Sequence, residues 1–352
     1  MAIFYNNKIK SATFIPTVNS EFDFEIDTYY LLQNIEENGF EISLNHRQSM
    51  YIGMKENSVE ILEESLKDFF KDAAEFFKKL AKKIIDFAKN AMKSFLSYFQ
   101  DFDKFLKNNE DTLRSLNPNF TFKGFDYKFP DAPVLTKAYD IAGSYNIEIN
   151  RMDSMKYADV LKMKDQFAGD SYKNEIRASI LGSNNNVNAD NFNDQSKLLF
   201  RSNKDAANIT VNKSYVDMIL REYSKLKTLL NETEAKKTKI VKMLNDFETF
   251  FLRKASVTYN NMEKQIQTNE IRTDDDKFQR GEIKTSNYSE ESLKVLNAYF
   301  DLKYAESRFI SNCLIHVYLD KVNAIRDCMK QYRAVIRQCL NKKSEPNTVE
   351  TK

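Results

Sequence analysis

Residues 67–99, KDFFKDAAEFFKKLAKKIIDFAKNAMKSFLSYF, decide the fold class of this protein. The stretch contains no glycine or proline, and lysines separate apolar residues that return at helical spacing. Between residues 62 and 106 the mean step from one apolar position to the next is about 3.7 residues, close to the period of an α-helix. A second apolar row widens the stripe into a face that one partner helix cannot cover. The pattern therefore predicts an amphipathic helix that packs against several others.

The composition of the whole chain supports long helices. Among 352 residues there are only seven glycines, five prolines and no tryptophan, and turn-rich sheets need more glycine and proline than this. Lysine and arginine (53) nearly balance aspartate and glutamate (51), so the overall charge indicates neither nucleic acid nor an acidic substrate as a partner. Any binding surface must therefore come from a local concentration of charge or apolar side chains.

The sequence pattern divides the chain into five segments. They are a small N-terminal region with strand (1–55), a long amphipathic helix (56–116), an extended or β segment (117–150), a helical bundle (151–343) and a disordered tail (344–352). The predicted fold class is mainly α, with long amphipathic helices in an elongated bundle and a small β-containing N-terminal portion. If residues 58–107 form one unbroken helix it is about 75 Å long, so either the helix breaks near Asn90 or the molecule is elongated.

Two stretches show the alternation of a half-buried strand. In the first, Phe22, Phe24 and Ile26 alternate with acidic residues. In the second, aromatic residues from Phe120 to Phe129 alternate on either side of Lys123-Gly124, which predicts a strand with a bulge or a short hairpin. We expect the two to pair in a small sheet. Further along, we expect helices at about 151–168, 213–267 and 289–341, with a polar loop at 182–191.

No motif in the sequence predicts catalysis, a cofactor or a metal. The GDSY stretch at 169–172 resembles a hydrolase nucleophile, but the only downstream histidine, His316, lacks the acid-and-histidine spacing of a triad, so a helix-initiating loop is predicted. His316 with Cys313 is too small a set for zinc and is expected in the core. Cys313, Cys328 and Cys339 return to nearly one helical face and are expected to be buried thiols in a reducing compartment. The chain is predicted not to be an enzyme.

Two candidate binding surfaces remain. The first is the Phe-rich stripe of the long helix, a predicted partner-binding surface made of Phe69, Phe70, Phe76, Phe77, Leu80, Ile84, Phe87 and Phe95. The second is a basic stripe near the C-terminus, with spacings of 4, 3 and 4 residues, made of Arg326, Lys330, Arg333 and Arg337. The basic stripe is predicted to be a solvated face in preference to a phosphate-binding one, because no aromatic residues interleave for base stacking.

A membrane is the main alternative partner for the Phe-rich stripe. In that hypothesis residues 67–99 insert into lipid, as in an ejection protein or a helical pore-forming toxin. Acidic residues along the helix bring its net charge to about zero, which removes most of the attraction to anionic lipid. Packing against helices is therefore preferred, and binding to nucleic acid is the weakest of the three hypotheses. Neither a signal peptide nor a membrane-spanning helix is expected.

Two stretches carry a resemblance to a known class of proteins. They are FFKKLAKKIIDFAKNAMKSF (76–95) and FAGDSYKNEIRASILGSNNNVNADNFNDQSKLLFRSN (167–203), followed by long helices. In amino-acid composition and in the spacing of residue types they resemble virion structural proteins of large tailed bacteriophages, which occur in the capsid interior, scaffold core or tail. The resemblance implies a non-enzymatic, multi-copy protein located in the virion, and in the host cytoplasm during assembly. Its implied partners are other virion proteins or copies of itself.

Overall fold

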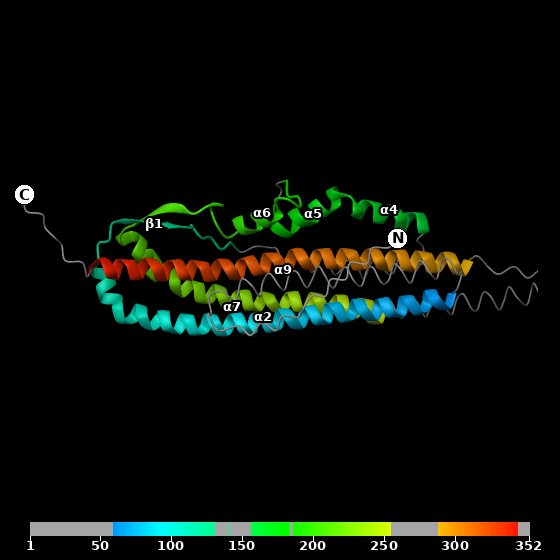
Figure 1. Cartoon of the computed structure of the whole chain (residues 1–352), viewed down its shortest axis with the longest axis horizontal. Helices are drawn as coiled ribbons and strands as arrows, with labels where there is room; N and C mark the ends of the chain where they lie inside the picture. Colours follow the sequence, from blue (N-terminus) through cyan, green and yellow to red (C-terminus); the bar gives the residue numbers. More distant parts are fainter. Residues whose placement is uncertain (1–58, 131–139, 141–155, 184–185, 255–287, 344–352) are drawn as a thin grey trace, which may run out of the picture.

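The computed structural model describes residues 59–130, 140, 156–183, 186–254 and 288–343 (Figure 1). The elements in chain order are α2 (Val59–Ser115), β1 (Phe120–Gly124), α4 (Tyr157–Ala168), α5 (Asp170–Leu181), α6 (Phe192–Leu198), β2 (Ala207–Val211), α7 (Lys213–Thr249), the π-helical turn η2 (Phe250–Lys254) and α9 (Tyr288–Lys343). Helices make up most of the described residues, which confirms the prediction of a mainly α fold.

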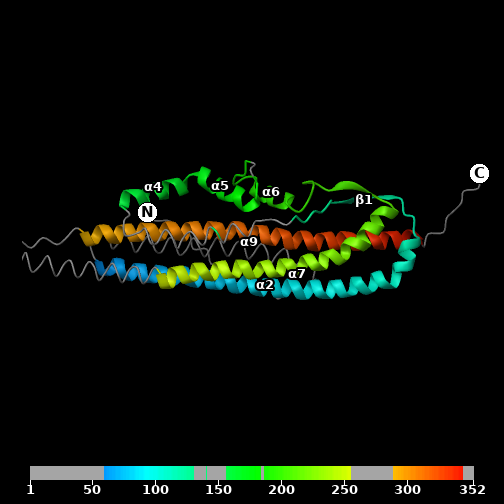
Figure 2. The same cartoon turned by 180° about the vertical axis from the view of Figure 1, so that it is seen from behind.

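Three long helices, α2, α7 and α9, lie side by side (Figures 1 and 2). Helix α2 continues for 57 residues without a break at Asn90, which corresponds to about 85 Å at 1.5 Å per residue. The chain colours show that α2 and α9 run in the same direction and that α7 runs opposite to both. This arrangement gives the broad apolar face of α2 the two partner helices that its width requires.

Aromatic side chains fill the space between the three helices. Phe77 is fully buried, and its ring centroid lies 5.3 Å from that of Phe247, 5.9 Å from Phe251 and 6.1 Å from Tyr304. Further along the bundle, Phe102 of α2 meets Tyr223 of α7 at 5.0 Å. Because large aromatic rings bury much apolar surface and prefer tilted or edge contacts, these pairs hold the helices in register.

The segment between β1 and β2 forms a second layer. Helices α4, α5 and α6 pack on α9, on the side away from α2 (Figures 1 and 2). Gly169 separates α4 from α5, so GDSY does begin a helix as predicted. Gly182, with a left-handed φ of 64°, ends α5 at a conformation that glycine adopts without strain. Helix α9 is therefore covered from two sides.

The sheet differs from the prediction. Strand β1 pairs antiparallel with β2, from Phe120 opposite Val211 to Gly124 opposite Ala207, and pairing resumes at an isolated bridge between Tyr127 and Arg201. Of the two alternatives expected for 120–129, the strand is present as β1, and the hairpin within the segment is not. Strand β2 was not predicted, because ANITV is only five residues long and carries a strand-disfavouring asparagine. The strand expected at residues 22–26 lies outside the described residues.

Candidate functional site

Polar side chains of α9 tie the second layer to the three long helices. We call Asp301, Asp320, Asp327 and Gln331 the polar seam. Asp301 pairs with Lys164 of α4 at 2.7 Å, and Asp320 accepts a hydrogen bond of 2.7 Å from Ser196 of α6. The four residues span 30 positions, or about 45 Å of helix. The seam therefore fixes the second layer at several levels along α9.

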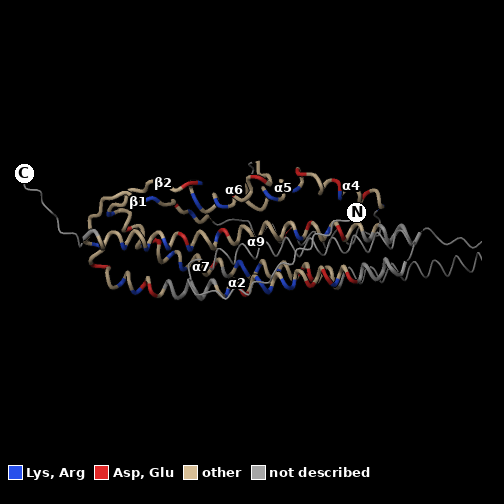
Figure 3. Tube along the Cα trace, viewed as in Figure 1, with Lys and Arg blue, Asp and Glu red and all other residues tan. Residues whose placement is uncertain are grey.

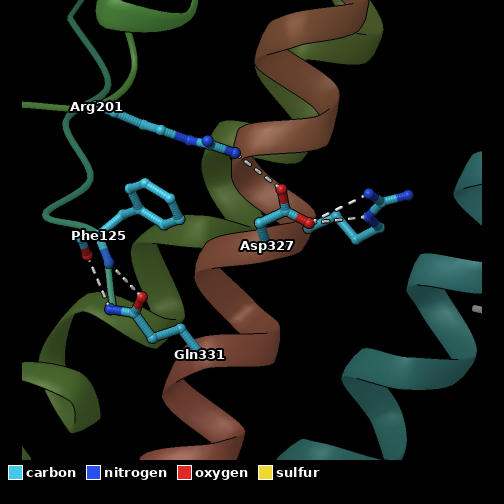
Figure 4. Close-up of polar contacts among 5 residues, drawn as sticks. Phe125, Arg201, Asp327 and Gln331 are labelled. Carbon is cyan, nitrogen blue, oxygen red and sulfur yellow. Dashed lines mark hydrogen bonds and ion pairs between the residues drawn. The ribbon is translucent and has the colours of Figure 1, made fainter. Parts of the chain in front are cut away.

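Asp327 holds the connection between α6 and β2. Figure 4 shows Arg201 reaching across to Asp327, with an Nη2 to Oδ2 distance of 3.1 Å. The Arg201 guanidinium also lies 4.3 Å from the ring centroid of Phe125 and 5.7 Å from that of Tyr127. Asp327 accepts a second contact from Arg326 at 3.2 Å. Since the carboxylate and both guanidinium groups are largely shielded from water, this contact is worth more than an exposed ion pair.

Gln331 completes the backbone hydrogen bonds of the chain after β1. Its Oε1 accepts from the Phe125 N–H at 2.8 Å, and its Nε2 donates to the Phe125 carbonyl at 2.9 Å (Figure 4). Gly124 makes this approach possible, because a Cβ there would lie 2.5 Å from Gln331 Oε1. The amide side chain thus replaces the strand neighbour that this part of the backbone lacks.

Replacing Gln331 with leucine is expected to destabilise the protein by about 1–3 kcal/mol, because both polar groups of Phe125 lose their partner in a part-buried site. The measurement is urea unfolding followed by circular dichroism. Gln338→Leu, seven residues further along α9 and half-buried, is the matched control and is expected to have a small effect. Equal destabilisation by both substitutions would contradict the role given to Gln331.

A second buried polar cluster joins α6 to α9. His316 Nε2 lies 3.4 Å from Asp320 Oδ2, and the Phe192 ring packs 5.7 Å from the imidazole. Burial lowers the pKa of His316, because desolvation disfavours the imidazolium more than Asp320 favours it. Burial likewise raises the pKa of Asp320, against the opposing effects of His316 and Ser196. His316 is a core histidine, as predicted, but its Asp320 partner was missed.

The lowered pKa of His316 predicts a loss of stability in acid. The unfolded chain binds a proton near the ordinary value of 6.5 and the folded chain binds it at lower pH, so stability is lost as pH falls from 6.5 through the folded pKa. We expect the drop in melting temperature between about pH 7 and about pH 5.5 to shrink in His316→Asn. An identical drop in both proteins would contradict this assignment.

An ion pair lies within the bundle itself. Lys303 Nζ and Glu306 Oε2 are 2.8 Å apart on α9, and their side chains are 3% and 8% exposed. The ammonium also lies 5.6 Å from the ring centroid of Tyr299. If either charge were removed, the other would stay buried and lose the counter-ion beside it, so each charge depends on the other.

The Phe-rich stripe lies in the protein's own core. Phe69, Phe70, Phe76, Phe77, Leu80 and Ile84 are buried, and Phe87 is partly buried against them. The side chain of Phe95 lies outside the described residues. These contacts are made within the chain, mainly to α7, η2 and α9. Binding of a partner by the same residues stays a prediction, and it would require these contacts to open.

The basic stripe is only partly solvated. Arg337 is exposed, and Lys330 and Arg333 are half-exposed. Arg326 is largely shielded, with 12% of its side chain exposed, and it contacts Asp327.

All three cysteines are buried and free, as expected from their spacing. Burial raises the pKa of the Cys313 and Cys328 thiols to about 12, so neither is a reactive thiolate near neutral pH.

Within the part of the chain that the structure describes, no group of three or more histidine, cysteine and acidic side chains is placed to hold a metal ion. In the same described ranges, no helix combines the length and hydropathy that crossing a bilayer needs. The structure instead offers long helices joined by part-buried polar contacts.

Comparison of the chain with protein-family models, with curated protein sequences and with solved structures finds no match. The protein is therefore classified by its fold alone. The fold is mainly α-helical, with the polar seam along α9.

Proposed function

We propose that this protein is a non-enzymatic structural or assembly protein of a bacteriophage virion and that it acts through helix-mediated protein–protein contacts. The observation that carries the proposal is the closed aromatic core between α2, α7 and α9. In this proposal the bundle is elongated, and exposed positions on its helices contact neighbouring molecules. The bacteriophage assignment comes from the sequence resemblance of residues 76–95 and 167–203.

The buried stripe also weighs against the membrane-active alternative. Phe69, Phe77 and Leu80 are at most 3% exposed, so insertion of residues 67–99 into lipid would first require the bundle to open. That opening would expose several large aromatic side chains, each worth about 1.5–3 kcal/mol of burial. We expect the full-length protein not to float with anionic liposomes. Flotation that increases as the bundle is loosened by mild urea would instead support the membrane-active alternative.

The direct test of the proposal is quantitative mass spectrometry of phage particles and assembly intermediates purified from cells that carry the gene for this chain. We expect many copies per particle or per intermediate. Absence of the protein from both would overturn the virion assignment. An analytical ultracentrifugation series on the pure protein then tells whether its contacts are to copies of itself or to other virion proteins.

A further inference from the structure

The second layer is attached to a single long helix. In the described ranges α4, α5 and α6 pack against α9 and against one another, and none of them packs to a comparable extent against α2 or α7. Figure 3 shows the same arrangement, with α4, α5 and α6 lying along α9 and away from α2. The aromatic contacts that join α2 to α7 and α9 are therefore made without the second layer.

The helices of the second layer are too short to be stable alone. Helices α4 and α5 have twelve residues each and α6 has seven, whereas isolated helices shorter than about 12–15 residues are marginal in water. The side chains that they bury are few: Val160 in α4, Ile176, Ile180 and Leu181 in α5, and Phe192 and Ser196 in α6. Because α5 also contacts α4 and α6, the three helices are expected to lose their contact with α9 together.

The polar contacts between the second layer and α9 are isolated from one another along the helix. Lys164 pairs with Asp301 through side chains that are 37% and 15% exposed. Ser196 donates one hydrogen bond to Asp320. Part-exposed contacts of this kind stabilise a fold less than the burial of aromatic side chains between the long helices does. Since elements with few buried contacts open first, the second layer is the part of the described structure most ready to separate.

An anchor follows the last helix of the second layer. Phe200 is buried, and Arg201 pairs with Asp327 while its guanidinium lies over the ring of Phe125. Strand β2 then pairs with β1. The pairings of Arg201 and of β2 are made outside α4, α5 and α6. They can persist when these helices leave α9, and they keep the second layer attached to the bundle.

A thiol lies beneath the second layer. The Phe309 ring of α9 is 6.1 Å from the ring of Phe167 in α4 and 5.0 Å from the Arg177 guanidinium of α5. Cys313 is one turn further along α9 and is buried. Burial raises the pKa of its thiol and the charge of Arg177 opposes this effect, as expected for a thiol close to α5. Separation of the second layer from α9 would therefore expose Cys313.

We propose that α4, α5 and α6 open from α9 as one unit while α2, α7 and α9 stay packed, so that the protein has a closed form and an open form. The open form presents the face of α9 that carries Phe309, Cys313 and Asp320. This face combines apolar side chains with a carboxylate that has lost its Ser196 partner, and it is covered in the closed form. The opening is a property of the isolated chain and is independent of the proposed role in a virion.

The test is thiol labelling of the native full-length protein at low reagent concentration, with peptide mass spectrometry to measure the label on Cys313. Two matched variants are compared, Ile180→Val in α5 and Ile240→Val in α7, both at buried positions. Ile180→Val is expected to raise the labelling rate of Cys313 about two- to tenfold, because it weakens the closed form relative to the open form. Ile240→Val should leave this rate unchanged, because the contacts of Ile240 persist in the open form.

The urea dependence of the same rate is a second measurement, made on the unaltered protein. Opening of the second layer exposes only part of the surface that complete unfolding exposes. The labelling rate of Cys313 should therefore rise less steeply with urea than the equilibrium constant for unfolding of the whole protein. An equal effect of the two isoleucine substitutions on Cys313, or an equally steep dependence on urea, would show that the second layer and the bundle open together and would overturn the proposal.

Discussion

Replacing Phe77 with aspartate is expected to abolish folding of the bundle. The Phe77 side chain is fully buried and touches Phe247 of α7, Phe251 of η2 and Tyr304 of α9. The substitution removes the aromatic contacts, which alone are worth about 3–5 kcal/mol, and adds a carboxylate that must be desolvated at a further cost of several kcal/mol. Because a domain is stable by only about 5–15 kcal/mol, the combined loss is close to its whole stability. Circular dichroism and size-exclusion chromatography measure the outcome.

The control for Phe77→Asp is Lys71→Asp, which adds the same carboxylate to an exposed position of the same helix. It should leave helicity and elution volume nearly unchanged, since surface substitutions usually change stability by less than about 0.5 kcal/mol. Phe77→Ala is expected to fall between the two. A helical Phe77→Asp protein with an unchanged melting temperature and oligomeric state would show that the aromatic core does not hold the bundle together.

Removing Glu306 is expected to have the second largest effect. In Glu306→Ala the Lys303 ammonium loses the carboxylate 2.8 Å away while it remains inside the bundle. Breaking a buried pair from one side costs about 3–5 kcal/mol, since the remaining charge stays desolvated and loses the counter-ion beside it. The double substitution Lys303→Met with Glu306→Leu removes both charges and is expected to be much less destabilising than either single change. Urea unfolding of the wild type, Lys303→Met, Glu306→Leu and the double variant gives the coupling free energy.

An exposed pair in the same protein provides the matched control. Glu222 and Lys225 on α7 have the same three-residue separation and an Nζ to Oε1 distance of 2.7 Å, but their side chains are 38% and 70% exposed. Glu222→Ala is expected to cost less than about 1 kcal/mol, because water solvates the remaining lysine. If Glu222→Ala and Glu306→Ala cost the same, burial does not determine the strength of the Lys303–Glu306 pair.

The elements that could be predicted are those whose signals are local. The Phe-rich stripe repeats at helical spacing within one segment, and the same side chains form the core face of α2. Gly169 between two helices and the buried cysteines also follow from nearby residues. Periodicity reports which face of a helix is apolar, and it does so without any knowledge of what covers that face.

The seam could not be predicted, because its partners are far apart in the sequence. Asp320, Asp327 and Gln331 appear among other polar residues of a long helix, and nothing in their spacing marks them as buried. Gln331 and Phe125 are 206 positions apart, and Arg201 and Asp327 are 126 apart. Strand β2 was missed for a similar reason, since its identity as a strand depends on pairing with β1.

The sequence by itself determined that this chain is mainly α-helical and which side of α2 is apolar, because both depend on contacts three and four residues apart. Only the tertiary structure decided what that side touches. It packs against α7 and α9 of the same chain, and α9 is covered from its other side by α4, α5 and α6. Because of that second covering, polar residues of α9 that would otherwise face water are partly desolvated and bind partners far away in the sequence.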